Sequence, residues 1–174
     1  MMLGEDEEAG AEGSFGSKSV WARISVIAAG PVFNFILAYV LSMVIVGAYG
    51  FDPAVISEVS PGFPAQEAGI RAGDVIKKLN GKRIHLAREV SNYITFHQGE
   101  DIEVTYERDG QRKTAVITPK ANEDGRYVMG VAVSGGYQKG NFLDVVRYGA
   151  YEVRYWVDLT IESVKMLISG QAGI

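Results

Sequence analysis

The chain has 174 residues and a net charge of −4, with 47% hydrophobic and 22% charged residues. It contains no cysteine, which excludes a disulfide scaffold, a thiolate zinc site and a cysteine nucleophile. The mild acidity, without a cluster of Lys and Arg, argues against a nucleic-acid-binding surface. Only two histidines are present, so a metal site built from this chain alone would need several carboxylates beside them.

An apolar segment near the N-terminus predicts a membrane helix. An acidic, Gly-rich stretch comes first, and no residue from Ile24 to Phe51 is charged. A helix of about 20 residues crosses the hydrocarbon core of a bilayer. The apolar core of a secretory signal peptide has only about 7–15 residues. We therefore expect a transmembrane helix over residues 24–51 rather than a cleaved signal.

The charges that flank this segment predict its orientation. Lys18 and Arg23 precede it, whereas Asp52 and Glu58 follow it. Positive residues favour the cytoplasmic side of a membrane. Residues 1–23 are accordingly expected to form a cytoplasmic juxtamembrane segment in the cell membrane, and residues from 52 onward to be extracytoplasmic.

Asn34 places an amide at hydrocarbon depth, where it should find a partner rather than face lipid. The small residues of Ala28–Pro31 would let another helix approach closely. Two interpretations stay open: Asn34 joins two helices, or it lines a polar cavity of a larger membrane protein. Both predict neighbouring transmembrane helices as partners.

Residues 52–135 read as a compact α+β domain. Asn80-Gly81 and Asp109-Gly110 each lie between apolar, β-branched runs, which predicts two hairpins. Apolar residues recur at helical spacing across Leu86–Phe96, which predicts an amphipathic helix. The strands are expected at Val55–Val59, Val75–Leu79, Ile102–Glu107, Lys113–Thr118 and, last, Tyr127–Val133.

The segment Val55–Lys82, which contains Ser60-Pro-Gly-Phe-Pro-Ala and Ala72-Gly-Asp-Val-Ile, resembles a bacterial PDZ domain. That family binds an extended peptide as an added strand, between a sheet edge and a helix. The matching binding strand comes last here, which resembles a circularly permuted arrangement. The resemblance implies a groove flanked by Tyr127, Val128, Met129, Gly130 and Val131 on one side and by Val90 and Ile94 on the other. The alternative is that these residues are only core.

The whole chain resembles the site-2 protease family, intramembrane zinc metalloproteases that cleave membrane-anchored regulators such as anti-sigma factors. The run Trp21–Ala38, with Ala-Gly-Pro-x-x-Asn-Phe, carries this resemblance together with the attached PDZ-like domain. It implies a membrane-anchored protein substrate, and zinc in the parent enzyme.

The zinc chemistry of that family needs two motifs that this sequence does not contain. One is H-E-x-x-H, and the other is a Leu-Asp-Gly that supplies a further ligand. His85 and His97 fit neither motif, and a helix between them would separate them by about 18 Å. We therefore expect no catalytic residue and no metal ligand in this segment, and we interpret the chain as a central fragment of its parent.

Residues 141–169 predict a C-terminal amphipathic helix. A charged stripe lies opposite an apolar face; it comprises Asp144, Arg147, Arg154, Asp158, Glu162 and Lys165. These charges argue against a membrane span, so we expect a helix that lies on the membrane or packs against other membrane helices. The alternative is a helix that completes a soluble core.

The leading functional hypothesis is a part of an intramembrane zinc metalloprotease whose PDZ domain recognises or filters substrates. Its expected partners are the bilayer, the substrate and the remaining transmembrane helices of the parent. A non-enzymatic, membrane-anchored PDZ adaptor is the alternative. A membrane-anchored serine protease is a third, but no stretch of the sequence is left to hold a protease domain.

Overall fold

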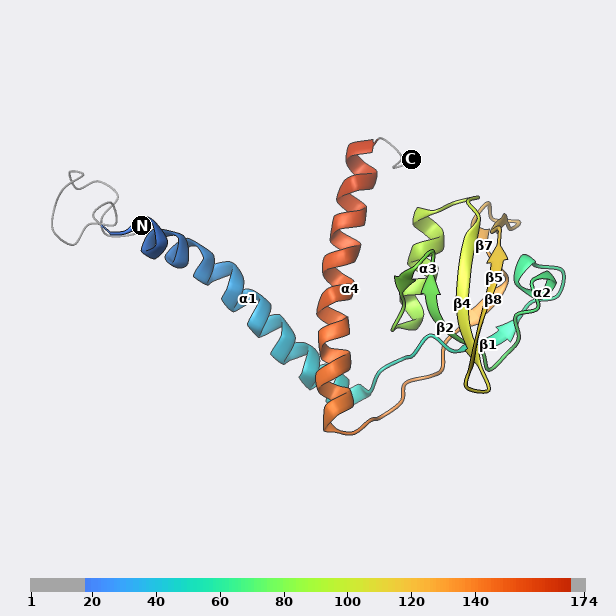
Figure 1. Cartoon of the computed structure of the whole chain (residues 1–174), viewed down its shortest axis with the longest axis horizontal. Helices are drawn as coiled ribbons and strands as arrows, with labels where there is room; N and C mark the ends of the chain where they lie inside the picture. Colours follow the sequence, from blue (N-terminus) through green and yellow to red (C-terminus); the bar gives the residue numbers. More distant parts are fainter. Residues whose placement is uncertain (1–17, 170–174) are drawn as a thin grey trace. The chain divides into compact units, whose positions relative to one another are not determined.

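A computed structural model describes residues 18–169 of the chain. Twelve elements follow one another in the sequence (Figure 1). They are α1 (Val20–Tyr49), β1 (Ile56–Val59), α2 (Pro64–Glu67), β2 (Val75–Leu79), β3 (Lys82–Arg83), α3 (Ala87–Phe96), β4 (Ile102–Arg108), β5 (Gln111–Ile117), β6 (Lys120–Ala121), β7 (Tyr127–Val128), β8 (Val131–Val133) and α4 (Phe142–Ser169).

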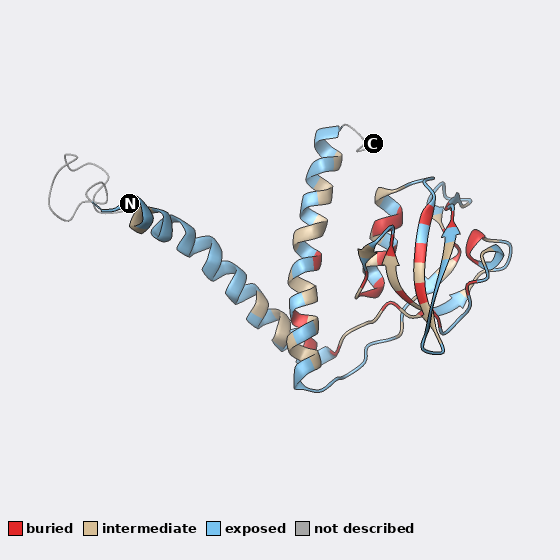
Figure 2. Cartoon of the chain, viewed as in Figure 1, coloured by how far each residue is buried: buried red, intermediate tan, exposed pale blue. Residues whose placement is uncertain are grey.

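Helix α1 contains the whole apolar segment except its last residues. It begins four residues before the expected start and includes Pro31 in its interior. Nearly all of its residues are exposed, Asn34 among them, as its pale colour in Figure 2 shows. Within residues 18–169, α1 is the only helix long and apolar enough to cross a membrane.

The two predicted hairpins organise the main sheet, whose strand order is β3-β2-β4-β5. Asn80-Gly81 joins β2 to β3, and Asp109-Gly110 joins β4 to β5; all four residues have positive φ angles. Tight hairpin turns require such angles, which Asn, Asp and Gly tolerate best. A second sheet pairs β1 with β8, and a third pairs β6 with β7.

The single strand expected over Tyr127–Val133 is wrong, because the structure divides it into β7 and β8. Gly130, between the two, has a φ of 80°, which interrupts an extended strand. β7 pairs with β6, whereas β8 turns to pair antiparallel with β1. The segment therefore changes sheets at Gly130.

The core lies between α3 and the strands, where the buried segments in Figure 2 face one another. It combines aliphatic side chains of every long strand with one face of α3. Among residues 18–169, Asp74 is the only charged residue that is buried, at 1% exposure. Arg108 satisfies it with two hydrogen bonds of 2.7 Å, from Nε to Oδ1 and from Nη2 to Oδ2.

Helix α4 is held against α3 by polar contacts. Asn92 Nδ2 donates to Tyr155 Oη at 2.7 Å, and Arg88 pairs with Glu152. Burial raises the pKa of Glu152, although the charge and hydrogen bond of Arg88 oppose that shift. Asp158, which belongs to the charged stripe predicted for this helix, lies 3.4 Å from Lys82 of β3, so part of that stripe faces the domain.

Candidate peptide-binding groove

A groove of about 520 Å³ runs between α3 and the chain from β7 to β8. Six of the seven residues that the PDZ resemblance implied line it: Val90, Ile94, Tyr127, Val128, Met129 and Val131. Gly130 is not among the lining residues, and Asn34 lies on α1, outside the groove. The structure thus brings together two segments that lie more than thirty residues apart in the sequence.

The floor of this groove is also part of the core. Val90 and Met129 are each 1% exposed, and both belong to the same buried cluster as Ile94. The two interpretations of these residues, groove and core, are therefore compatible. A charged residue substituted for Val90 or Met129 would unfold the domain, so such a variant cannot test peptide binding.

The rim of the groove is polar and was missed by the sequence analysis. Ser91 and Thr95 on α3 are exposed, and so is Gln98, two residues past its end; Arg126 and Tyr127 are exposed on the opposite side. Ser91, Thr95 and Gln98 follow Val90 and Ile94 by one residue or one helical turn. Consecutive residues of a helix lie about 100° apart around its axis, so helical spacing places Ser91 and Thr95 beside the apolar face of Val90 and Ile94 and not on it.

Strand β8 presents a free edge. One edge pairs with β1, in the register Ile56 with Val133 and Val59 with Val131. In the part of the chain that the structure describes, no strand pairs with its other edge. Unpaired backbone N–H and C=O groups on such an edge can bind an extended peptide as a further strand.

Contacts from the N-terminal part of the domain fix the bend between β7 and β8. The amide of Ala65 donates to the carbonyl of Met129 at 2.9 Å, and that of Ser60 donates to the carbonyl of Gly130 at 2.8 Å. A Cβ atom at Gly130 would lie 2.0 Å from the Cβ of Phe63. Only glycine fits here, so the geometry of the groove depends on this close approach.

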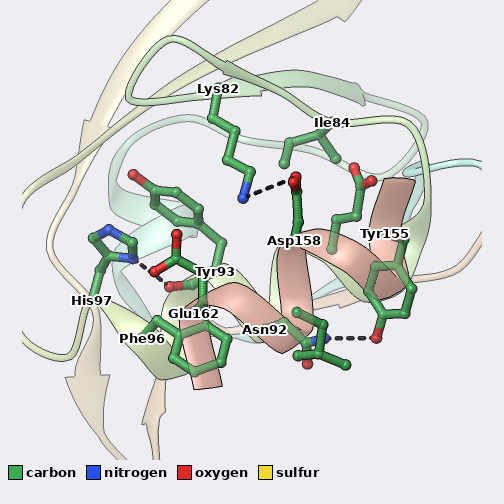
Figure 3. Close-up of a pocket in the computed structure, with 11 residues that line it drawn as sticks. Lys82, Ile84, Asn92, Tyr93, Phe96, His97, Tyr155, Asp158 and Glu162 are labelled. Atoms are coloured by element: carbon green, nitrogen blue, oxygen red, sulfur yellow. Dashed lines mark hydrogen bonds and ion pairs between the residues drawn. The ribbon is translucent and has the colours of Figure 1, made fainter. Parts of the chain in front are cut away.

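A second cavity, of about 220 Å³, lies on the other side of α3, against α4 (Figure 3). Lys82 Nζ and Asp158 Oδ2 are 3.4 Å apart there, and Glu89 and Glu162 add two more carboxylates. Glu89 Oε2 accepts a hydrogen bond of 2.7 Å from the amide of His85, and burial raises its pKa. This cavity belongs to the α3–α4 contact and is separate from the groove.

The residues present do not fit a zinc ion. His85 stacks on Tyr151 with ring centroids 3.7 Å apart, and His97 stacks on Tyr93. His97 Nδ1 lies 2.9 Å from the carbonyl oxygen of Tyr93. Across residues 18–169, no group of three His, Asp or Glu side chains could hold a metal.

Comparison with known proteins shows that the chain is similar to bacterial zinc metalloproteases and to PDZ domains. Residues 41–119 match the family model of the PDZ domain. The chain is 32% identical over 164 residues to the regulator of sigma-W protease RasP of Bacillus subtilis. This match covers 90% of this chain and 38% of that protein. It is also 32% identical over 163 residues to the zinc metalloprotease RasP of Geobacillus kaustophilus, with 90% and 38% covered.

A solved PDZ domain of an SdrC-like protein from Listeria monocytogenes is 21% identical, with a TM-score of 0.43; the match covers 48% of this chain and 88% of that chain. The chain spans about half the length, or less, of the curated relatives that it matches; the shares are 50%, 51% and 38%.

Proposed function

We propose that this chain, which is homologous over most of its length to zinc metalloproteases of the site-2 protease family, forms the membrane anchor and the substrate-docking domain of an intramembrane protease. The observation that carries the proposal is the groove between α3 and β8, with a free strand edge above an apolar floor. In this proposal residues 24–51 span the bilayer and residues 52–135 form the PDZ domain.

The substrate class follows from the groove. An extended segment pairs its backbone with β8 and places alternate apolar side chains over Val90, Ile94 and Met129. The relative named regulator of sigma-W protease supports a membrane-anchored regulator as the protein that supplies this segment. Docking would hold the substrate near the protease or exclude substrates that do not fit.

The zinc chemistry is proposed to lie in the rest of the parent enzyme. The names of the relatives support a zinc ion there. The two histidines described here are engaged in stacking contacts, so this segment contributes anchoring and recognition.

The circular permutation is part of the proposal. Its support is that β8, the last strand, pairs with β1, the first, so the strand beside the groove enters the sheet from the C-terminal end of the domain.

Helix α4, within the segment 141–169, is proposed to contact the membrane or the remaining transmembrane helices of the parent. Its polar side faces the domain: Glu152 and Tyr155 contact α3, and Asp158 pairs with Lys82 of β3. Several of its apolar residues are exposed, among them Trp156 at 58% and Leu167 at 68%. An exposed apolar helix face of this kind is typical of a surface that contacts a membrane or another protein segment.

The groove can be tested with Ser91→Trp in the full chain, reconstituted in lipid nanodiscs. Ser91 is exposed on the rim, so the indole should fill the groove without entering the core. The dissociation constant of a dye-labelled ten-residue peptide with apolar residues at alternate positions should rise about ten-fold or more. Thr114→Trp, at an exposed position on β5, is the matched control and should leave it unchanged. Equal affinity of the two variants for the peptide would contradict the proposal that the peptide binds in the groove.

The extracytoplasmic orientation can be tested by labelling, because the chain has no native cysteine. Asp124→Cys, in the exposed loop before β7, should react with a membrane-impermeant maleimide on intact cells. Ser17→Cys, on the opposite side of the apolar segment, should react only after permeabilisation. The reverse pattern would refute the proposed topology.

A further inference from the structure

A third cavity, of about 470 Å³, is lined by several lysine and arginine side chains and lies on the face of the domain that is made by β2, β3 and the start of α4. A single carboxylate, that of Glu107, lies among its lining residues. The five cations around it are Lys77, Lys78, Arg83, Arg112 and Arg147. The cavity is therefore strongly basic in a chain whose net charge is −4.

Local structure explains why these cations converge. The pairing of β2 with β4 shifts between Ile76 and Lys78, where a β-bulge inserts an extra residue. A bulge re-aims side chains that would otherwise alternate between the two faces, so Lys77 and Lys78 both line the cavity. Arg112 lies directly opposite Glu107 in the pairing of β4 with β5. Arg147 enters from α4.

Most of this charge is not neutralised within the domain. Lys77 Nζ lies 3.5 Å from Glu107 Oε2, but both side chains are more than one-third exposed. Among residues 18–169, no carboxylate lies within ion-pair distance of Lys78, Arg83 or Arg112. The pKa of the neighbouring His85 is lowered by burial first, and then by the charges of Arg154, Arg147 and Arg83. Several cationic donors therefore remain available for an anion.

The cavity is close, along the chain, to the end of the apolar helix. Pro53 and Ala54 line it, and α1 ends at Tyr49. Four residues of extended chain span at most about 14 Å, and the interfacial layer of a bilayer is about 5–7 Å thick on each side. Phe51 stacks on Tyr148 with ring centroids 3.7 Å apart, and Tyr148 and Tyr151 also line the cavity. Tyrosines are enriched at this depth.

We infer that this basic cavity binds the phosphate headgroup of an anionic phospholipid and so holds the domain close to the membrane surface. The inference rests on the proposed membrane insertion of α1. Lys and Arg donate to a phosphate diester as charge-assisted hydrogen bonds, and the tyrosine rings contact the upper part of the lipid. Neither the groove nor its free strand edge takes part in this contact.

Lipid selectivity tests the inference in the full chain, reconstituted in phosphatidylcholine nanodiscs. Spin-labelled phosphatidylglycerol should associate with the protein more tightly than spin-labelled phosphatidylcholine. The double variant Lys78→Gln, Arg112→Gln should lower this preference about five-fold or more. The matched control is Lys113→Gln, Lys120→Gln, which removes the same charge; Lys113 follows Arg112 on β5 and points to the other face. The control should keep the preference.

A second readout lies in the cavity itself. Phosphatidylglycerol in the nanodisc should raise the pKa of the His85 ring, measured by NMR, because a bound phosphate offsets the cationic charges that lower it. An equal rise with inorganic phosphate alone, or with an acidic peptide, would overturn the lipid assignment. So would equal preference in the wild type and both double variants.

The two proposals fail separately. A chain that does not insert into nanodiscs would overturn membrane anchoring and, with it, this inference. A chain that inserts and binds the groove peptide, but shows no preference for the anionic lipid, would overturn this inference alone.

Discussion

Replacing Asp74 by Ala is expected to lower the free energy of unfolding by about 3 kcal/mol, the lower end of the range for breaking a buried ion pair. The carboxylate is 1% exposed and accepts from both Arg108 and the amide of Arg71, the latter at 2.8 Å. Its removal leaves the guanidinium of Arg108 with one remaining bond, from Nη2 to the carbonyl of Gly69 at 2.8 Å. Urea unfolding at neutral pH measures the loss. A change below 1 kcal/mol would show that the pair is not structural.

The control is Glu107→Ala, one residue before Arg108, which breaks an ion pair between exposed side chains. Such pairs contribute about 0–1 kcal/mol. The pH dependence provides a further check. Burial alone would raise the pKa of Asp74, but the hydrogen bonds from Arg108 and Arg71 and the charge of Arg108 hold it below its ordinary value. The stabilisation is therefore present above a pH of about 4, the unfolded pKa, and is lost as the pH falls through the folded pKa. In Asp74→Ala this acid-dependent loss should be absent.

Gly130→Ala is expected to cost about 3 kcal/mol or more and to abolish peptide binding. Two effects add: the φ of 80° strains an alanine, and its Cβ would overlap Phe63. To relieve the overlap, the bend between β7 and β8 must move. Met129 and Val131 lie at this bend and line the groove, so the movement changes the shape of the groove. Thermal or urea unfolding gives the stability, and peptide titration gives the affinity.

Gly110→Ala separates the two effects. Gly110 does not line the groove and has a φ of 75°, almost the same as Gly130, but no atom lies within 4 Å of the position that a Cβ would take. It should therefore cost only the conformational strain, about 1 kcal/mol. Equal losses in the two variants would show that the contact with Phe63 does not constrain the groove.

Local signals in the sequence were sufficient for most elements of the domain. Asn80-Gly81 and Asp109-Gly110 predicted both hairpins, and apolar spacing predicted α3 to within one residue of its start. The same spacing placed Val90 and Ile94 on the face that lines the groove. These features depend on residues that are close in sequence, so the local pattern determines them.

Features that depend on distant contacts were not predicted. The division of the last strand depends on Gly130 meeting Phe63, far earlier in the chain. The pair of Asp74 and Arg108 joins residues 34 positions apart. The convergence of Lys77 and Lys78 depends on a bulge, which no composition rule locates. Likewise, helical spacing predicted the charged stripe of α4 but no partner for its charges, and Asp158 pairs with Lys82 of β3.

Strand addition at β8 is the central claim, and NMR of the full chain in nanodiscs measures it most directly. Titration with the alternating apolar peptide should shift the methyl groups of Ile94 and Met129 in a saturable way, and leave Ile70, which does not line the groove, unchanged. Amides on the free edge of β8 should become protected from hydrogen exchange at the same peptide concentration, and in Ser91→Trp both effects should need a peptide concentration about ten-fold higher or more. Shifts confined to residues outside the groove, or binding without protection of β8, would contradict the account.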